Sequence, residues 1–211
     1  DAADGFYQVP LLPKDSYLTA FTVDSRQYRF LVAPQGLKNT PLVFQNLMNS
    51  VLRRHHLLDQ VELRTIMPFM EPEIRQRYAG WDPHTIVGTT ACYIDDIIAG
   101  TYRTGTDAEH AELHHAHLLA LLHACDADDI HLKWSKCCFY RVTVAFLGEI
   151  VGNGERRVNP EKVASVAAWP PPTKVRELQA FLGFCNFFRR HIVSFSETAA
   201  PLYSLAKKGV T

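Results

Sequence analysis

The sequence lacks an excess of charge of either sign. Among its 211 residues, Lys and Arg together number 22, and Asp and Glu together also number 22. A protein that grips a nucleic-acid duplex over its whole surface usually carries a large positive charge, because it must neutralise many phosphates. The balance therefore excludes a uniformly basic binding surface and confines any phosphate contact to part of the chain.

Cysteine pairs and long apolar runs are missing as well. The five cysteines are an odd number, none stands in a CxxC pair, and no signal peptide or long apolar span accompanies them. These absences argue against a disulfide framework, a cysteine-rich zinc module and a membrane partner. We expect a reducing, intracellular setting, either a cytoplasmic particle or the nucleus.

The residues that are present suit a folded protein. Hydrophobic residues make up 47% and charged residues 21% of the sequence, which suffices for one or two cores. From residue 151 onward nine residues are basic and four are acidic. This basic part is a candidate for phosphate contacts, although a solvated helical surface gives the same count.

Aromatic and branched residues at 28–32 predict a strand that ends in the tight loop Ala33-Pro34-Gln35-Gly36. A helix is expected next, capped by Asn39 or Thr40, with Pro41 in its first turn. Residues 55–90 lose this regularity and carry scattered Pro and Gly, with possible short helices at 57–63 and 73–78. We interpret this stretch as an insertion on the surface.

The next apolar run, 91–100, is broken by Asp95-Asp96, which predicts two strands with the carboxylates at the hairpin tip. Beyond it, the pattern predicts further elements and a boundary at the rigid Trp169-Pro170-Pro171-Pro172 connector. The first of these elements is a helix capped by Asp107 and running to about Cys125. Strands follow at 130–134, 138–142 and 144–151, with a turn at Gly152-Asn153-Gly154. The last two elements are a helix capped by Thr173 and running to about Arg190, and a helix at 195–207.

Three acids are candidates for metal chemistry. Asp95 and Asp96 are adjacent and flanked by Ile94 and Ile97. Their charges repel, and partial burial adds to the cost, so a divalent cation is a natural neutraliser. The alternative is an exposed hairpin turn, where Asp is common. Asp1 stands at the head of another apolar segment and is the third acid.

Several motifs occur in a fixed order along the chain. They are Asp1-Ala-Ala-Asp-Gly-Phe6-Tyr-Gln-Val-Pro with Leu18-Thr-Ala-Phe-Thr22, Pro34-Gln-Gly-Leu-Lys-Asn-Thr-Pro-Leu-Val-Phe-Gln45, Tyr93-Ile-Asp-Asp96, Lys136-Cys137 with Phe139, Phe146-Leu-Gly148, Val158-Asn-Pro-Glu-Lys-Val163 and Phe181-Leu-Gly-Phe-Cys-Asn-Phe-Phe-Arg-Arg190. In this ordered series the chain resembles the reverse transcriptases of retroviruses and of gypsy-like long-terminal-repeat retrotransposons.

The resemblance implies an α+β polymerase fold, in which an antiparallel palm sheet packs on helices. Residues 1–150 would form the palm with partial fingers, and residues 151–211 the palm–thumb connection and a mainly helical thumb. The long 55–90 stretch departs from the family, which usually has a short link there. The fingers residues that normally precede Asp1 are absent from the sequence, so we expect the isolated segment to be inactive or nearly so.

The resemblance also assigns catalytic roles. Asp1, Asp95 and Asp96 correspond to the ligands of two Mg²⁺ ions, for which Mn²⁺ can substitute, because hard oxygen ligands suit these cations. Lys136 stands where polymerases of this kind place a lysine that protonates the departing pyrophosphate. An ordinary surface lysine is the alternative for Lys136.

Further positions correspond to nucleotide contacts. The backbone near Asp4, Gly5 and Phe6 would hold the triphosphate, since unpaired N–H groups form an anion site. Phe6 would also pack under the sugar and select deoxynucleotides, unless it only packs in the core. Gln35, where many gypsy-like enzymes carry Phe, would lie against the nucleotide, and Tyr93 would complete the substrate contacts.

Two groups correspond to nucleic-acid contacts. The first, Phe146-Leu147-Gly148, would grip the primer end, because Gly permits close approach of a nucleic-acid backbone. A core strand with a bulge is the alternative. The second group lies on the expected thumb helix and comprises Asn186, Arg189 and Arg190. Their contacts would be independent of sequence and would follow phosphates and duplex shape.

The resemblance therefore implies an RNA-directed DNA polymerase that extends a primer on an RNA or DNA template with dNTPs. It also implies neighbouring protease, ribonuclease H and integrase segments of a polyprotein. The rival interpretation is a decayed or domesticated module that binds nucleic acid or acts as a scaffold without activity. A weaker rival is an RNA-templated RNA polymerase. His110, His114 and His117 share a helical face, but no Cys or acid completes a tetrahedral zinc set.

Overall fold

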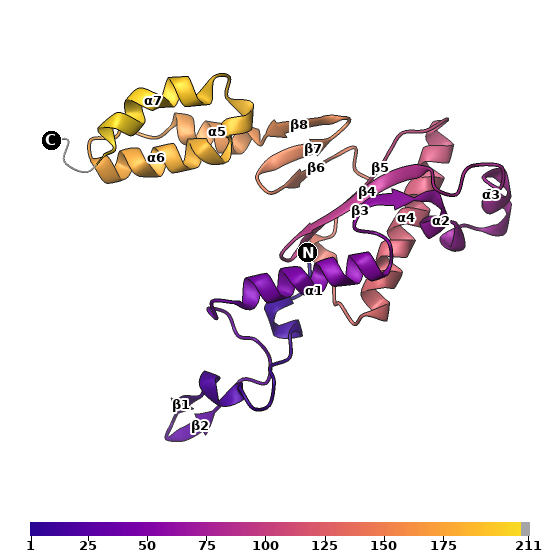
Figure 1. Ribbon diagram of the computed structural model, residues 1–211, viewed down its shortest axis with the longest axis horizontal. Helices are drawn as coiled ribbons and strands as arrows, with labels where there is room; N and C mark the ends of the chain where they lie inside the picture. Colours follow the sequence, from indigo (N-terminus) through magenta and orange to yellow (C-terminus); the bar gives the residue numbers. More distant parts are fainter. Residues whose placement is uncertain (208–211) are drawn as a thin grey trace. The chain divides into compact units, whose positions relative to one another are not determined.

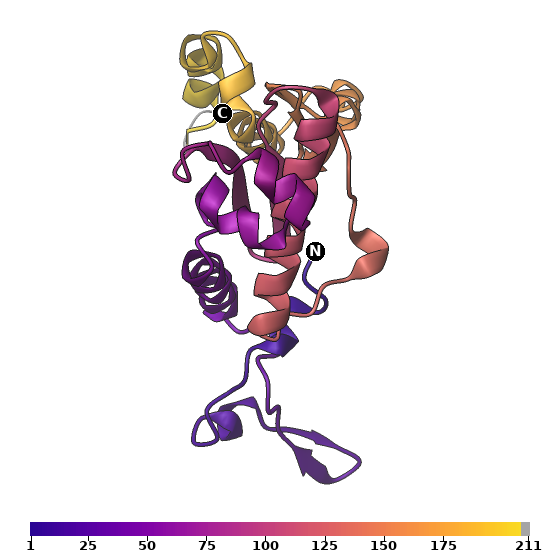
Figure 2. The same ribbon diagram turned by 90° about the vertical axis from the view of Figure 1, so that its right-hand side faces the viewer.

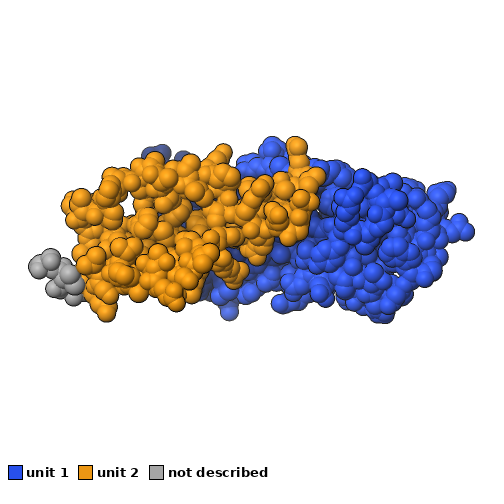
Figure 3. Space-filling model, turned by 90° about the horizontal axis from the view of Figure 1, so that it is seen from above, with its two compact units in different colours: residues 1–140 blue, residues 141–211 orange. Residues whose placement is uncertain are grey.

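The computed structural model describes residues 1–207. Lys208, one of the nine basic residues counted from residue 151 onward, lies outside the described residues. The chain divides into two compact units, Asp1–Tyr140 and Arg141–Thr211, which Figure 3 colours separately. Both contain helices and antiparallel strands, which confirms the predicted α+β class. Within residues 1–207, none of the helices has the length and apolar character needed to cross a membrane.

The first unit is built on a three-stranded antiparallel sheet with the order β3-β4-β5. Its strands are β3 (Asp59–Glu62), β4 (Ile86–Tyr93) and β5 (Asp96–Thr101). Two long helices, α1 (Thr40–Arg54) and α4 (Asp107–Ala127), contact this sheet and each other (Figure 1). The core lies between these elements, where Phe44 and Leu113 are fully buried.

Both long helices begin at residues suited to a helix start. Asn39 is the N-cap of α1 and Pro41 lies in its first turn, as predicted. The expected cap of the second helix is wrong, because Thr106 rather than Asp107 caps α4. The Thr106 hydroxyl accepts a hydrogen bond from the Glu109 amide, and the Glu109 carboxylate accepts one from the Thr106 amide. This reciprocal pair satisfies two otherwise unpaired donors.

The segment 55–90 is not confined to the surface, which corrects the expectation from its irregular sequence. The expected helix at 57–63 is instead the strand β3, which pairs with β4. The short helices α2 (Leu63–Ile66), η3 (Met67–Phe69) and α3 (Pro72–Arg77) follow, and α3 corresponds to the predicted helix at 73–78. Apolar side chains of this segment belong to the core of the unit, namely Leu57, Val61, Leu63, Ile66, Met70, Tyr78 and Val87.

Between the first motif and α1 the chain forms an exposed arm, visible below α1 in Figures 1 and 2. It carries η2 (Ser16–Thr19) and the hairpin of β1 (Phe21–Val23) with β2 (Arg26–Tyr28), and it follows η1 (Gly5–Gln8), which contacts α1. The strand expected at 28–32 is therefore misplaced. Asp24 and Ser25 adopt positive φ values in a two-residue turn that places Phe21, the first residue of β1, opposite Tyr28, so the pairing ends at Tyr28.

After α4 the chain is less regular than predicted. Residues 130–134 make only an isolated bridge, Ala2 with Leu132, before the short turn η4 (Trp134–Lys136). Residues 138–142 form no strand, and Tyr140 has a positive φ of 53° that is incompatible with one. The two strands expected in this stretch are therefore wrong.

The second unit starts with an antiparallel sheet of the order β6-β7-β8. The strand expected at 144–151 is split by a turn into β6 (Thr143–Phe146) and β7 (Glu149–Gly152). The predicted turn at Gly152-Asn153-Gly154 leads into β8 (Glu155–Val158).

Helices α5 (Pro160–Ala167), α6 (Val175–Phe187) and α7 (Phe195–Leu205) complete the second unit. Leu178 and Leu182 of α6 form a small core with Ala199 of α7. Thr173 does not cap α6, because the Glu177 carboxylate accepts the amide protons of Thr173 and Lys174 and the helix starts one residue later.

Candidate active site

The acids Asp95 and Asp96 lie at the tip of the β4–β5 hairpin, as predicted. Tyr93 pairs with Asp96, so Ile94 and Asp95 form a two-residue turn. Ile94 has a φ of 55°, which is unusual for a β-branched residue and indicates local strain. Asp95 is exposed and Asp96 is half-buried. Because the turn that carries them is strained, neighbouring groups must hold the hairpin tip in place.

Gln45 of α1 holds this strained tip. The Ile94 amide donates a hydrogen bond to Gln45 Oε1 at 2.7 Å, and Gln45 Nε2 donates to the Cys92 carbonyl oxygen at 3.2 Å. Burial raises the pKa of the nearby Cys92 thiol, although its hydrogen bond with Gln45 opposes the shift. Sequence reasoning missed Gln45 as a site residue, although it ends the second motif and follows the buried Phe44.

Asp1 is brought beside the hairpin through the backbone. The Ala2 amide donates to the Asp95 carbonyl oxygen at 2.8 Å, and the Lys133 amide donates to the Asp1 carbonyl oxygen at 2.9 Å. Gln8 fastens the same segment, because its Nε2 donates to the carbonyl oxygens of Ala3 and His131. Gln8 is thus a second positioning residue that the sequence alone did not reveal.

Lys136 joins this group directly. Its Nζ lies 3.0 Å from Asp1 Oδ2, while about half of the Lys136 side chain remains exposed. The structure therefore brings together Asp1, the Asp95 backbone and Lys136 from three separate segments. Attraction to the carboxylate explains why this lysine points toward the acids, whereas an unrelated surface lysine would extend into water.

The residue types at this site, though not their present arrangement, are suited to a divalent cation. Three aspartate side chains offer the hard oxygen atoms that Mg²⁺ and Mn²⁺ prefer. Among residues 1–207, however, no three His, Cys, Asp or Glu side chains are already gathered as a metal site. Asp1 is instead paired with Lys136.

The first motif forms a tight turn against the core. Asp4 has a φ of 48°, and the buried Gly5 leaves room for a ring, since a Cβ there would lie 2.9 Å from Phe44. Phe6 packs edge-on against Phe44, with ring centroids 6.1 Å apart. Phe6 is therefore a core contact that is still half-exposed, whereas Gln35 is exposed in the loop before α1.

The candidate nucleic-acid contacts lie in the second unit. Phe146, Leu147 and Gly148 form the β6–β7 turn, in which Leu147 and Gly148 have positive φ values. Asn186 lies on α6. The expectation that Arg189 and Arg190 share this helix is wrong, because α6 ends at Phe187 and both arginines lie in the separate turn η5 (Arg189–His191).

Glu149 links these two groups. Its Oε1 lies 2.8 Å from His191 Nε2, and its Oε2 accepts a hydrogen bond from Arg156 Nε at 3.0 Å. The hydrogen bond from His191, followed by that from Arg156, lowers the pKa of the Glu149 carboxyl. A Cβ at Gly148 would lie only 3.6 Å from the Phe187 and Phe188 rings. The β6–β7 turn and the end of α6 thus form one surface.

A family model described as "Reverse transcriptase (RNA-dependent DNA polymerase)" matches residues 1–151 of the chain. The chain belongs to the reverse transcriptase family. This reverse transcriptase chain is 29% identical over 207 residues to the retrovirus-related Pol polyprotein from transposon opus of Drosophila melanogaster, covering 98% of the chain and 17% of the polyprotein. It is 31% identical over 209 residues to that from transposon 297 of the same organism, covering 99% and 16%. The chain thus spans about a sixth of the length of these relatives.

Solved structures give the same result for the fold. A foamy viral protease-reverse transcriptase in complex with double-stranded DNA matches 97% of this chain and 29% of its own, with a TM-score of 0.71 and 25% identity. The same type of protein in complex with an RNA/DNA hybrid covers 98% and 23%, with a TM-score of 0.66 and 25% identity. The predicted polymerase palm fold is confirmed. Reverse transcriptases generally use divalent metal ions, which agrees with the acidic hairpin.

Replacement of Gln45 by alanine is expected to loosen the hairpin tip without unfolding the unit. The Ile94 amide would lose its acceptor, and one such bond contributes on the order of 1 kcal/mol. Amide hydrogen exchange at Ile94 should accelerate by about fivefold. Gln60→Ala, on the exposed side of β3, is the matched control and should leave this rate unchanged. An unchanged rate in Gln45→Ala would contradict the positioning role.

Proposed function

We propose that this chain is a segment of an RNA-directed DNA polymerase, which extends a primer on an RNA or DNA template with dNTPs. One observation carries the proposal. The Ala2 amide binds the Asp95 carbonyl oxygen at 2.8 Å, which sets Asp1 beside the Asp95-Asp96 hairpin in a chain of the reverse transcriptase family. Residues far apart in the sequence thus converge where the reaction needs negative charge.

Divalent cations are proposed to bind to the side chains of Asp1, Asp95 and Asp96. The proposed cations are two Mg²⁺ ions, for which Mn²⁺ is a possible substitute. When bound, such ions stabilise charge on transferring phosphates and activate the primer hydroxyl. Gln45 and Gln8 fix the two backbone segments that carry these acids. The protein's contribution is therefore to hold the backbone segments that carry these acids before the substrates arrive.

The remaining residues of the first unit are proposed to handle the nucleotide. Lys136, whose Nζ contacts the Asp1 carboxylate, is proposed to donate a proton to the departing pyrophosphate. The backbone of Asp4 and Gly5 is proposed to bind the triphosphate, and the half-exposed face of Phe6 to contact the sugar. Gln35 and Tyr93 are exposed and are proposed to touch the nucleotide.

In the second unit, the surface formed by the β6–β7 turn and the end of α6 is proposed to contact the primer and template. It carries the residues Phe146, Leu147, Gly148, Asn186, Arg189 and Arg190. Its arginines suit phosphates, and the tight turn at Gly148 suits close approach of a nucleic-acid backbone. We assign residues 1–150 to the palm with partial fingers, and residues 151–211 to the connection and thumb.

The relatives named as Pol polyproteins support further proposals about context. We infer that the enzyme works beside protease, ribonuclease H and integrase segments, in a cytoplasmic particle or in the nucleus. The competing function is a nucleic-acid-binding or scaffold module without activity. The ion pair of Asp1 with Lys136, held beside the Asp95-Asp96 hairpin by the bond from the Ala2 amide to the Asp95 carbonyl oxygen, favours the polymerase, because a scaffold does not require this arrangement.

Primer extension tests the proposed function. A DNA primer on an RNA template would be incubated with dNTPs and Mg²⁺, using the 211-residue chain and the same chain fused after the upstream fingers segment of the opus relative. We expect extension by the fused polypeptide and loss of extension when the metal is chelated. Duplex binding without extension, under conditions in which the opus polypeptide is active, would favour the inactive module.

Phe6→Ala is expected to relax the choice of sugar. Removal of the ring opens space beneath a bound nucleotide, so ribonucleotides should be used more readily relative to deoxynucleotides, by about tenfold or more. Competition between dATP and ATP in primer extension measures the ratio. Phe30→Ala, a change of the same size in the exposed arm, is the control. An unchanged ratio with intact folding would show that Phe6 serves only the core.

A further inference from the structure

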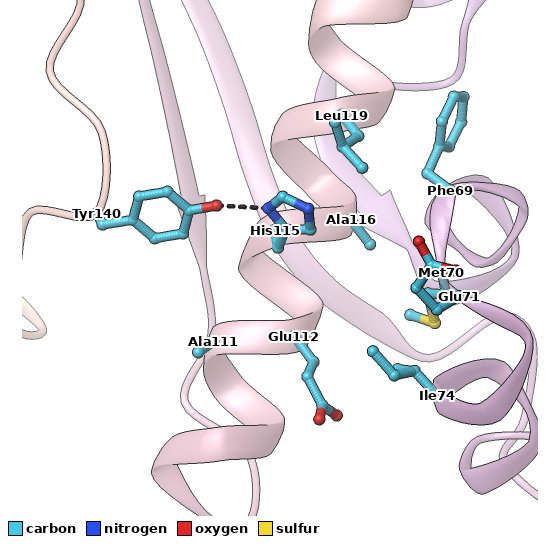
Figure 4. Close-up of a pocket in the computed structure, with 10 residues that line it drawn as sticks. All are labelled: Phe69, Met70, Glu71, Ile74, Ala111, Glu112, His115, Ala116, Leu119 and Tyr140. Atoms are coloured by element: carbon cyan, nitrogen blue, oxygen red, sulfur yellow. Dashed lines mark hydrogen bonds between the residues drawn. The ribbon is translucent and has the colours of Figure 1, made fainter.

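A carboxylate of the second unit joins the two segments that are proposed to contact nucleic acid. The first unit ends at Tyr140, whose hydroxyl lies 2.5 Å from His115 Nδ1 (Figure 4). Glu149 and its partners, His191 and Arg156, all lie beyond that residue in the chain. Their arrangement therefore belongs to the second unit alone.

Both carboxylate oxygens of Glu149 are occupied, and its side chain is largely covered. Oε1 accepts a hydrogen bond from His191 Nε2 at 2.8 Å, and Oε2 accepts one from Arg156 Nε at 3.0 Å. Only 12% of the Glu149 side chain and 22% of the His191 side chain are exposed, against 58% for Arg156. Removing one partner from a covered ion pair is costly, whereas an exposed pair contributes little. The bond between Glu149 and His191 is therefore the stronger half of this cluster.

The turn η5 depends on this bond for its place. It has only three residues, and within it the His191 amide donates to the Phe188 carbonyl oxygen at 2.9 Å. So short a turn is not stable by itself. The His191 side chain supplies a contact from outside the turn, because its partner Glu149 lies 42 residues earlier in the sequence, on β7. The other two residues of η5, Arg189 and Arg190, are exposed, and the contact that fixes His191 also limits their directions.

The β6–β7 turn is held at the same place. Glu149 is the first residue of β7 and directly follows Gly148, whose φ is 79°. A Cβ at Gly148 would lie 3.6 Å from the ring of Phe188, which is buried at the junction between α6 and η5. The Asn159 amide also donates to the Gly148 carbonyl oxygen, at 3.2 Å. The turn and η5 are therefore joined by an apolar contact through Phe188 and by the hydrogen bond of Glu149.

We propose that Glu149 is a positioning residue for nucleic-acid binding. Through His191 it holds η5 against the β6–β7 turn, so that Arg189 and Arg190 present their charges to a primer–template duplex together with the turn. Glu149 itself does not touch the duplex. The inference rests on the proposed function, because it requires that this surface contacts the primer and template.

The direction of the expected effect separates positioning from the attraction of net charge. Loss of a negative charge near phosphates should, by charge alone, strengthen duplex binding. Loss of the carboxylate that orders η5 should weaken it, because arginines without a fixed direction lose more conformational entropy on binding. Glu149→Gln is therefore expected to weaken duplex binding by about tenfold, although the variant is more positive than the unaltered chain.

Fluorescence anisotropy of a labelled RNA/DNA hybrid, titrated with the 211-residue chain at a fixed salt concentration, measures this effect. Glu155→Gln is the matched control. Glu155 is exposed on β8, and alternation along that strand directs its side chain away from the face that carries Arg156. The control should leave the dissociation constant unchanged or lower it. His191→Leu removes the donor to Glu149 and should weaken binding as Glu149→Gln does, so it tests the proposal even if Glu149→Gln proves unstable.

A second background shows whether the effect acts through the arginines. In a chain that carries Arg189→Gln and Arg190→Gln, the addition of Glu149→Gln should change duplex affinity by less than about twofold. An equal loss in both backgrounds would give Glu149 a purely structural role and overturn the proposal. Thermal unfolding verifies that each variant is folded.

The outcomes also separate this inference from the proposed function. Absence of binding by the unaltered chain would contradict the proposed nucleic-acid surface, and the role of Glu149 with it. Binding by the unaltered chain, with no weakening in folded Glu149→Gln and His191→Leu, would overturn only the role of Glu149.

Discussion

Asp95→Asn in the fused polypeptide is expected to reduce primer extension by about 10³-fold or more, because loss of the proposed metal ligand would remove several kcal/mol of transition-state stabilisation. Asparagine has nearly the same shape, so the backbone bond from the Ala2 amide to the Asp95 carbonyl oxygen should persist. The side chain is exposed, and its replacement should not disturb the core. The loss should therefore appear in the rate of extension and not in folding.

The matched control is Asp129→Asn. Asp129 is also exposed and has a positive φ of 57°, which asparagine tolerates. Single-turnover extension, measured at saturating primer–template, separates chemistry from binding. An Asp95→Asn enzyme that retains more than about a tenth of the activity would show that Asp95 is no metal ligand.

Acidification is expected to destabilise the first unit through His117. This imidazole is fully buried in α4, with Nε2 2.7 Å from Thr90 Oγ1 and Nδ1 3.2 Å from Thr101 Oγ1. Burial, with a smaller contribution from His114, lowers the pKa of His117 to about 4 from its ordinary 6.5. The unfolded chain therefore takes up a proton at a higher pH than the folded chain does.

The sign of the effect follows from this difference. The stability contributed by neutral His117 is fully present above about pH 6.5 and is lost progressively as the pH falls toward about 4, up to about 3 kcal/mol. Urea unfolding at about pH 7 and about pH 4.5 measures this loss. His117→Gln, which cannot titrate, should show a smaller difference between the two conditions, whereas the exposed control His131→Gln should match the unaltered chain. Identical pH dependence in His117→Gln would assign the effect to other groups.

The local signals in the sequence predicted α1 and the acidic hairpin well. Asn39 and Pro41 are strong markers of a helix start, and Asp95-Asp96 inside an apolar run marks a turn. The prediction failed where tertiary contacts decide. Val61 belongs to a short strand because β4 offers it a partner, and no local pattern reveals that pairing. The buried Leu57 and Tyr78 likewise belong to the core although their segment is irregular.

The candidate site, like the fold, could be predicted only in part from the sequence. The motifs predicted the acids and Lys136 as site residues from their residue types, and the structure brings Lys136 into contact with Asp1. Gln8 and Gln45 were missed, because a glutamine that holds a backbone is recognisable only from its partners, here His131 and Ile94. The positions of Arg189 and Arg190 were misjudged by a few residues, since helix ends depend on capping geometry that sequence patterns locate poorly.

The central claim is that Asp1, Asp95 and Asp96 together bind divalent cations. Paramagnetic broadening by dilute Mn²⁺ in amide spectra of the chain tests it most directly, beside the double variant Asp1→Asn, Asp95→Asn. The account predicts selective broadening of the amides of Ala2, Ala3 and residues 94–96, and its loss in the variant. Equal broadening in the variant, or broadening centred on other acidic residues, would contradict the claim.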